Sequence, residues 1–221
     1  MKRKSRFKRN LLISMILIAV IWYLKNYNKS EAVSIKNINS DFSRVIVSKN
    51  YELGEDYKPS NLQKPNIIFA DESTDEERLV DGIIKEPLEN LVRAAKNDGI
   101  ILLGNSGYRS YDTQKELYNM RVLSDGKQMA DKYVAKAGFS EHQTGLAIDL
   151  TNEYRYFVKG TNEAEWLENN CYKYGFIIRY PEGKESITGV AYEPWHIRYV
   201  GEEVSRYIYE NNITLEEYLG K

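Results

Sequence analysis

Apolar and polar positions recur along the chain with two periods, which divide residues 44–221 into short helices and short strands. Apolar residues spaced three or four positions apart predict amphipathic helices. The predicted helices cover residues 87–96, about 111–122, 127–137, 164–174, 202–211 and 215–219. Terminal signals support two of them, because Thr214 and Glu217 form a capping box before the last helix and Gly175 follows residue 174.

Shorter apolar runs predict the strands. Runs of apolar residues bounded by loops are typical of strands that a sheet buries on at least one face. The predicted strands cover residues 44–53, 100–103, 146–150, 176–180 and 195–199. Helices before and after short, mostly antiparallel strands predict the α+β fold class, with a small mostly antiparallel sheet flanked by helices.

The first 24 residues differ from the rest in charge and hydropathy. Residues 1–10 hold six basic residues and no acidic ones, and residues 11–24 are apolar apart from Ser14. This order is typical of a secretory signal or a signal anchor. The apolar run is shorter than the about 17–25 residues of a usual bilayer span, so a cleaved signal peptide stays open. No small-x-small cleavage site follows the run, which favours an uncleaved membrane anchor.

This interpretation predicts a single-pass protein of the cell membrane. Residues 1–10 would form a basic cytoplasmic segment, since positive charge favours the cytoplasmic side. Residues 25–43 are polar and predict a linker. Residues 44–221 would then form an extracellular domain, which would be secreted if the amino-terminal segment were cleaved.

The charge and the cysteine content exclude further classes. Without its first ten residues the chain carries 25 basic and 32 acidic residues, and such an acidic body is not a nucleic-acid binder. The single cysteine, Cys171, excludes an intramolecular disulfide. Its helical spacing from Leu167 and Tyr174 predicts a packed helix residue rather than a nucleophile.

The two histidines of the chain both lie near carboxylates. Asp149 follows His142, and Glu193 precedes His196. Zinc accepts imidazole and carboxylate ligands, so this pattern predicts that His142, Asp149 and His196 bind one zinc ion, with Glu193 as the adjacent base. The alternatives are a hydrogen-bonded structural pair and a structural zinc site, but structural zinc usually takes four protein ligands, often cysteines.

The spacing of these residues restricts the backbone. A straight strand rises about 3.3 Å per residue, so the seven residues from His142 to Asp149 would span about 23 Å. Ligand atoms lie about 2 Å from zinc. The chain must therefore fold back, and Gly145 can adopt the backbone angles this needs. Pro194 disfavours a helix at Glu193, which predicts a bend followed by a strand rather than a helical H-E-x-x-H motif.

Several separated motifs resemble one family in their order and spacing. They are Ser140-x-His142-x-x-Gly145-x-Ala147-x-Asp149, then Glu193-x-x-His196, the upstream Ser106-Gly107-Tyr108-Arg109-Ser110 with Gln114, and the opening Val47-Ser48-Lys49-Asn50-Tyr51-x-Leu53 with Tyr57, Pro59 and Leu62. Over roughly residues 44–210 the chain is similar to the VanY-type zinc D-alanyl-D-alanine carboxypeptidases and the related L,D-carboxypeptidases.

The resemblance implies roles for residues that spacing alone does not assign. It favours Glu193 as the catalytic base over Glu141, which competes because it neighbours a predicted ligand. It makes Arg109 a catalytic residue that stabilises the oxyanion or binds the substrate carboxylate. The residues implied to line the substrate pocket are Tyr108, Ser110, Gln114 and Ser140.

The resemblance also implies an activity, the removal of the terminal D-alanine from peptidoglycan stem peptides. Three protein ligands leave a fourth zinc position for water, whose pKa zinc lowers. Pentapeptide stems would make the protein a D,D-carboxypeptidase, which in some relatives lowers the target of glycopeptide antibiotics. Tetrapeptide stems would make it an L,D-carboxypeptidase. A non-catalytic cell-wall-binding module is the remaining alternative, and no ligand or base is missing to indicate it.

Overall fold

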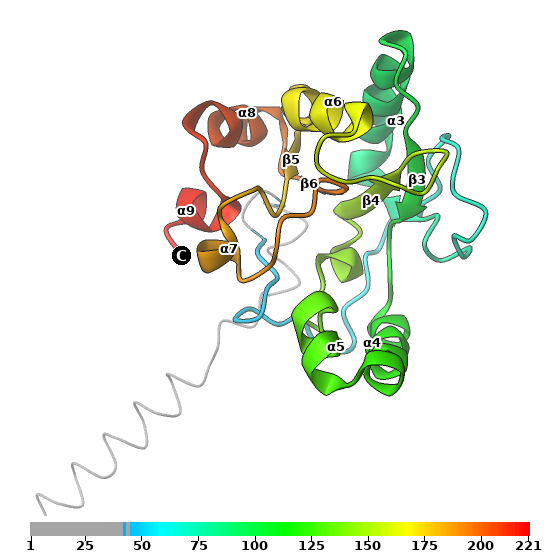
Figure 1. Cartoon of the computed structure of the whole chain (residues 1–221), viewed down its shortest axis with the longest axis vertical. Coiled ribbons are helices and arrows are strands. Elements are labelled where there is room, and N and C mark those ends of the chain that lie inside the picture. The colour runs from blue at the N-terminus through cyan, green and yellow to red at the C-terminus, as the bar shows by residue number, and fades with distance from the viewer. Residues whose placement is uncertain (1–41, 43–44) are drawn as a thin grey trace, which may run out of the picture. The chain divides into compact units, whose positions relative to one another are not determined.

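A four-stranded antiparallel sheet carries the fold. The structure is a computed structural model that describes residue 42 and residues 45–221. The strands lie in the order β3–β4–β6–β5 (Figure 1). Their bounds are Leu103–Ser106 (β3), Ala147–Thr151 (β4), His196–Tyr199 (β6) and Phe176–Ile178 (β5). All three pairings are antiparallel and helices flank the sheet, which confirms the predicted α+β fold class.

Helices connect the strands and follow them at the carboxyl end. The α-helices are Gly82–Asn97 (α3), Tyr111–Asp125 (α4), Lys127–Tyr133 (α5), Asn162–Asn170 (α6), Glu185–Thr188 (α7), Glu202–Asn211 (α8) and Leu215–Leu219 (α9). The 3-10 helices are Glu141–Thr144 (η2) and Cys171–Tyr174 (η3). A separate two-stranded antiparallel sheet pairs Leu62–Gln63 (β1) with Val80–Asp81 (β2).

The main hydrophobic core packs helices α3 and α6 against one face of the sheet. Helix α3 contributes the buried stripe Ile84, Leu88, Leu91 and Ala95. The sheet contributes Ile148, Leu150 and Ile197. Successive side chains of a strand point to opposite faces. Asp149 and His196, which are adjacent in sequence to these core residues, therefore point to the face away from the core.

The ends of several helices agree with the sequence. Helices α8 and α9 have the predicted bounds, and Thr214 and Glu217 form the predicted capping box. Helices α6 and η3 together cover the predicted helix, and Gly175 closes it in the left-handed conformation. Cys171 is buried there, as predicted for a packed helix residue. These predictions succeeded because each rests on contacts between residues close in sequence.

The predicted strand at residues 100–103 is displaced by three residues. The N–H of Ile100 donates to the carbonyl oxygen of Ala95, so this residue still belongs to the end of α3. Ile101 is exposed to solvent. Pairing with β4 begins at Leu103 and continues to Ser106, which the sequence had placed in a loop.

The predicted strand at residues 44–53 is absent from the described part of that segment. Its one pairing is an isolated bridge between Ser48 and Tyr51. Val45 is buried, as the alternation of apolar residues predicts, but its carbonyl oxygen accepts a hydrogen bond of 2.7 Å from the guanidinium of Arg198. The Arg198 side chain thus occupies a backbone carbonyl oxygen that a strand would need for hydrogen bonds to a neighbouring strand.

Helix α3 begins five residues before its predicted start at Pro87. Its cap is Asp81, whose side chain accepts a 3.0 Å hydrogen bond from the N–H of Ile83. Pro87 consequently lies inside the helix, where it has no backbone N–H to donate to the helical hydrogen-bond pattern. The buried stripe extends back to Ile84, so packing against the sheet offsets the missing hydrogen bond.

The remaining differences lie at the ends of two elements and within one predicted loop. Helix α5 stops at Tyr133 rather than residue 137, because Val134 adopts an extended conformation. Strand β5 is shorter than predicted and ends at Ile178. The short helix α7 forms within a segment expected to be a loop.

The predictions for the amino-terminal region fall outside the described residues. This applies to the basic segment at 1–10, to the membrane anchor at 11–24 and to the linker at 25–43 apart from Phe42. Within residues 45–221 the structure contains no helix that is both long and apolar enough to span a membrane.

Gly145 provides a test of the turn that precedes β4. The backbone φ of Gly145 is 68°, and a Cβ added at this position would lie 2.9 Å from the backbone nitrogen of Asp81. We expect Gly145→Ala to lower the free energy of unfolding by about 2–5 kcal/mol, from left-handed strain plus overpacking. Gly160→Ala is the matched control, since Gly160 has a φ of 85° and nothing within 4 Å.

Gly160→Ala should lower the free energy of unfolding only by the cost of the left-handed backbone conformation, about 1–2 kcal/mol. Urea denaturation of both variants measures the difference. Equal losses would contradict the close approach of Gly145 to Asp81.

Candidate active site

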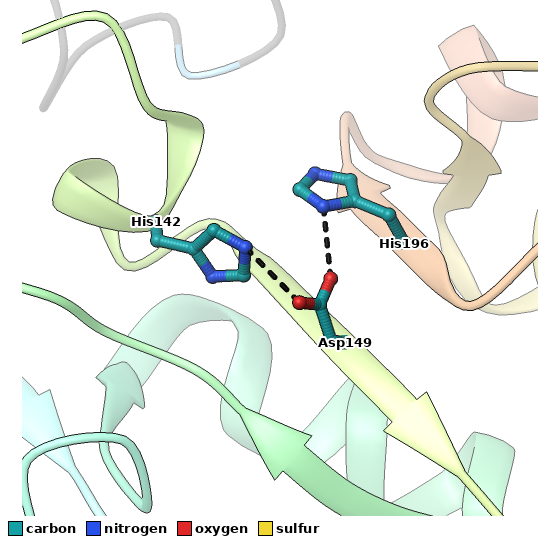
Figure 2. A group of neighbouring side chains, drawn as sticks. All are labelled: His142, Asp149 and His196. Atoms are coloured by element: carbon teal, nitrogen blue, oxygen red, sulfur yellow. Dashed lines mark ion pairs between the residues drawn. The ribbon is translucent and has the colours of Figure 1, made fainter. Parts of the chain in front are cut away.

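Asp149 and His196 lie opposite each other on neighbouring strands. They are partners in the β4–β6 register, and His196 Nδ1 lies 2.9 Å from Asp149 Oδ1. His142 comes from η2, and its Nε2 lies 3.4 Å from Asp149 Oδ2 (Figure 2). One ligand atom from each of the three residues lies within 4.8 Å of the other two. The structure thus brings the three predicted metal ligands together.

A tight turn carries His142 to the strand. The turn η2 ends at Gly145, whose φ is 68° and whose N–H donates to the His142 carbonyl oxygen at 3.1 Å. The chain therefore folds back where the spacing required it. His142 Nδ1 lies 2.7 Å from the carbonyl oxygen of Gly107. A carbonyl oxygen only accepts hydrogen bonds, so Nδ1 carries the proton and Nε2 presents its lone pair to Asp149.

The two histidines have opposite pKa shifts. Burial and the Arg109 guanidinium lower the pKa of His142. Burial also lowers the pKa of His196, but the adjacent carboxylates of Asp149 and Glu141 outweigh it and raise that pKa to about 9. Burial raises the pKa of Asp149, yet the two histidines hold it well below its usual range. Without a metal ion, the cluster at neutral pH thus combines a neutral His142, an ionised Asp149 and a protonated His196.

The donor set of this cluster fits a divalent metal ion. Bonds of about 2 Å to a tetrahedral ion place ligand atoms about 3.3 Å apart. The two nitrogen–oxygen distances in the cluster are 2.9 and 3.4 Å. Asp149 Oδ1 is buried and has no hydrogen-bond partner among the described residues, although His196 is adjacent. A cation bound between these atoms would satisfy that oxygen and replace the proton on His196.

Glu193 lies beside the cluster. Its Oε2 is 3.9 Å from His196 Nδ1, and 22% of its side chain is exposed. The backbone forms the predicted bend around Pro194, since the Glu193 N–H donates to the Tyr180 carbonyl oxygen and the His196 N–H donates to the Glu193 carbonyl oxygen. Burial raises the pKa of Glu193 to about 7, although His196 opposes this. Such a carboxyl group can accept and release a proton at neutral pH.

Glu141, the competing candidate for the base, is held by two arginines. Its Oε1 accepts hydrogen bonds of 2.7 Å from Arg179 Nε and 2.8 Å from Arg198 Nη1. Burial raises the pKa of Glu141, but the two guanidinium groups outweigh this and hold it below its usual range. A carboxylate fixed in this way is a poor proton carrier, which leaves Glu193 as the better-placed base.

A pocket of about 590 Å³ opens over the cluster, and Glu193 lines it. Arg109, Gln114 and Ser140, to which the family resemblance assigns catalytic or substrate-binding roles, also line this pocket. Arg109 Nη1 donates to Gln114 Oε1 at 2.8 Å, and Gln114 Nε2 donates to the Ala135 carbonyl oxygen at 2.7 Å. Gln114 is buried in α4 and thus fixes Arg109 at the predicted junction between β3 and α4.

Two predicted substrate residues lie outside the lining of the pocket. Tyr108 is buried, and its N–H donates to the Leu79 carbonyl oxygen at 2.7 Å. Ser110 caps α4, and its Oγ accepts a 3.2 Å hydrogen bond from the N–H of Thr113. These contacts hold the loop that carries Arg109.

Three residues near the site had not been predicted. Arg179 and Arg198 are fully buried, and the ring of Tyr180 lies 5.0 Å from that of His196 between centroids. A signal for the arginines was present, because each follows apolar residues of a predicted strand. A charged residue in a buried strand requires a buried partner.

Comparison with known proteins matches the same part of the chain. The family model for VanY, D-alanyl-D-alanine carboxypeptidase, matches residues 77–202. The chain belongs to the VanY family. It is 42% identical over 182 residues to the putative carboxypeptidase YodJ of Bacillus subtilis (strain 168), which covers 80% of this chain and 67% of YodJ. The resemblance seen in the separated motifs is thereby confirmed.

Solved structures of relatives of this VanY-family protein share its fold. The LD-carboxypeptidase LdcB superimposes with a TM-score of 0.74 at 42% identity, over 79% of this chain and 84% of LdcB. A mutant of the vancomycin resistance D,D-pentapeptidase VanY from a VanB-type cassette, in complex with Zn(II), gives 0.69 at 34% identity, over 81% and 99%. Relatives of both specificities therefore resemble this chain.

The opposite pKa shifts of the histidines predict the behaviour of the metal-free protein. NMR titration of the ring signals should show His196 titrating near pH 9 and His142 neutral at pH 7. The assignment is direct because the chain has two histidines. A His196 that titrates at or below about 6.5, the usual value, would contradict its close approach to the carboxylates of Asp149 and Glu141.

The same shift predicts how stability depends on pH. A pKa raised by folding stabilises the protein below the unfolded value of about 6.5, and this gain is lost as the pH rises through the folded value. The free energy of unfolding of the metal-free protein should therefore fall between about pH 6.5 and 9. His196→Gln is the control, since it should remove this part of the pH dependence.

Proposed function

We propose that this VanY-family protein is a zinc-dependent carboxypeptidase that removes the terminal D-alanine from peptidoglycan stem peptides. The observation that carries the proposal is the cluster of His142, Asp149 and His196 in a pocket that Glu193 and Arg109 also line. The relatives support the substrate class and the metal. The LdcB structure concerns peptidoglycan recognition, and the VanY pentapeptidase structure contains Zn(II).

His142 Nε2, His196 Nδ1 and a carboxylate oxygen of Asp149 are the atoms that would hold the zinc ion. A zinc ion in this pocket supplies a Lewis acid for the scissile carbonyl and lowers the pKa of water. Three protein ligands that face a pocket are typical of catalytic zinc, whereas structural zinc usually has four. The position of the cluster on the pocket wall therefore favours catalysis over a structural role.

Glu193 is the proposed proton carrier. Burial raises the pKa of its carboxyl group to about 7 in the metal-free protein. Next to the cluster, this group can accept a proton from the attacking water and pass it to the leaving amine of D-alanine. Its Oε2 lies 3.9 Å from the His196 nitrogen that faces the cluster. Glu193 thus lies next to the three proposed metal ligands and is not itself a proposed ligand.

Arg109 is the proposed anion-binding residue. Its guanidinium can bind the terminal carboxylate of the peptide in a bidentate manner, or stabilise the oxyanion that forms during hydrolysis. Gln114 holds one end of the guanidinium at 2.8 Å, which keeps the side chain in the pocket. Ser140 lines the same pocket and can add a hydroxyl donor.

The alternative specificity, L,D-cleavage of tetrapeptide stems, is supported by one observation. LdcB, an LD-carboxypeptidase, has a TM-score of 0.74 and 42% identity with this chain, against 0.69 and 34% for the D,D-pentapeptidase. Both activities release D-alanine and differ in the configuration of the residue before it. The zinc cluster is compatible with either.

We also propose that residues 11–24 anchor the protein in the cell membrane, with the catalytic domain on the outer side. The support is the apolar run that follows the six basic residues of the segment 1–10. Stem peptides are found outside the membrane, so this orientation would place the pocket on the substrate side.

Incubation with stem peptides tests the reaction and its specificity. The full chain with zinc is mixed separately with pentapeptide and tetrapeptide stems, and released D-alanine is followed by mass spectrometry. Release from pentapeptide alone indicates a D,D-carboxypeptidase, and release from tetrapeptide indicates an L,D-carboxypeptidase. Stoichiometric zinc without release from either peptide would overturn the carboxypeptidase proposal.

Replacement of Glu193 separates proton transfer from metal binding. We expect Glu193→Gln to lower kcat by about 10²–10⁴-fold, the usual contribution of a general base. Zinc stoichiometry should stay at one ion, because Glu193 is not a proposed ligand. Glu182→Gln is the matched control, since Glu182 pairs with Lys159 at the surface. Equal kcat values for the two variants would contradict the assignment of the base.

Replacement of Arg109 separates its two proposed roles. If it binds the substrate carboxylate, Arg109→Lys should raise KM and reduce the preference for a free carboxyl terminus over an amidated one. If it stabilises the oxyanion, kcat should fall with KM nearly unchanged, because the interaction exists only in the transition state. Steady-state kinetics with both peptides measures this, and an unchanged kcat/KM would exclude both roles.

A further inference from the structure

Two buried atoms without partners face each other beside the zinc cluster. Glu141 Oε2 and His196 Nε2 are both buried and lack a hydrogen-bond partner of normal geometry among the described residues. They lie 3.5 Å apart. His196 presents its other nitrogen, Nδ1, to Asp149 at 2.9 Å. A neutral imidazole that gives its Nδ1 lone pair to a metal must carry its proton on Nε2, and Glu141 is the acceptor that Nε2 faces.

The other oxygen of Glu141 is fixed by two arginines. Oε1 accepts from Arg179 Nε at 2.7 Å and from Arg198 Nη1 at 2.8 Å. Both arginine side chains have no exposed surface. Charge-assisted hydrogen bonds of this length hold the carboxylate ionised and in one orientation. The free oxygen, Oε2, is consequently directed at His196.

The C-terminal helix completes this arrangement. Glu216, in α9, accepts two hydrogen bonds from Arg179, from Nη2 to Oε1 at 2.6 Å and from Nη1 to Oε2 at 3.0 Å. This bidentate pair is buried and sets the plane of the guanidinium that holds Glu141. Glu216 lies beyond residues 77–202, the part of the chain that the family model matches. A connected set of charges thus extends from outside the family match to a predicted metal ligand.

We propose that Glu141 is a positioning residue that sets the tautomer of His196 for zinc binding, and that Glu216 supports it through Arg179. The inference rests on the proposed function, because it assumes that the cluster binds zinc. Residues that orient a metal ligand through its second nitrogen typically change metal affinity by about 10–100-fold when they are replaced.

The chemistry of Glu141→Gln makes the expectation specific. The amide oxygen of the new side chain would stay with Arg179 and Arg198, because these groups only donate. Its NH2 group would then face His196 Nε2 and favour the tautomer that accepts there. That tautomer carries its proton on Nδ1, which is the atom that the zinc ion needs.

Zinc affinity of the full chain, measured by competition with a chelator, tests this proposal. We expect Glu141→Gln to weaken zinc binding by about 10–100-fold. Glu216→Gln should weaken it by less than Glu141→Gln does, because it acts through Arg179. Glu217→Gln is the matched control on the same helix, since Glu217 pairs with Lys184 near the surface, and it should leave the affinity unchanged.

Two results would overturn the proposal. One is a folded Glu141→Gln protein that binds zinc as tightly as wild type. The other is a Glu216→Gln protein whose zinc affinity equals that of Glu217→Gln, which would remove the role of α9. Circular dichroism and thermal unfolding of each variant show whether it is folded.

NMR of the zinc-loaded wild type tests the tautomer without any variant, so a failure of Glu141→Gln to fold leaves the proposal testable. Ring nitrogen shifts are assignable because the chain has two histidines. We expect zinc on Nδ1 and a proton on Nε2 in His196, and the reverse in His142, whose Nδ1 donates to Gly107. Zinc bound through Nε2 of His196 would overturn the inference.

These outcomes are distinct from a failure of the proposed function. A wild-type protein that binds zinc with the expected tautomers but releases no D-alanine would overturn the proposed reaction and support the positioning role of Glu141. A wild-type protein that does not bind zinc would overturn both.

Discussion

The register between β4 and β6 is the constraint on which the site and the core both depend. It pairs Asp149 with His196 and, one residue earlier on β4, Ile148 with Ile197. The first pair faces the pocket and the second faces helices α3 and α6. A shift of one residue would exchange the two faces of a strand and bury a proposed metal ligand in the core. The same backbone hydrogen bonds therefore hold the hydrophobic interior and align two of the proposed metal ligands.

The parts of the structure that could be predicted from the sequence rest on local chemistry. Thr214 and Glu217 cap a helix within one turn, and the left-handed Gly145 reverses the chain between two ligands. The scarcity of histidine pointed to His142 and His196, and the structure places both beside Asp149. The strands were less predictable, because their ends depend on the partner. Leu103–Ser106 pairs with β4, while the N–H of Ile100, three residues earlier, still bonds to the end of α3.

The burial of Arg179 and Arg198 has a local signal, but their pairing with Glu141 and Glu216 could not be predicted from any local pattern. Arg179 is 38 residues from Glu141 and 37 from Glu216, so no short-range periodicity connects them. From the sequence, Glu141 was a candidate base because it neighbours a ligand, and the structure gives it a different position, between two guanidinium groups. The cost of burying a charge explains the network, since each carboxylate or guanidinium in it needs an opposite partner. The residues that only the family resemblance assigns to the substrate pocket fall into two groups. Gln114 and Ser140 reach the pocket, whereas Tyr108 and Ser110 support the loop next to it.

The proposed function depends on one zinc ion bound by His142, Asp149 and His196. Its most direct test is a crystal structure of the full chain grown with zinc, with anomalous diffraction recorded on both sides of the zinc absorption edge. The account predicts a single strong anomalous peak about 2 Å from His142 Nε2, His196 Nδ1 and an oxygen of Asp149, on the pocket side of the sheet. No peak between these three residues, or a peak ligated by other residues, would contradict it.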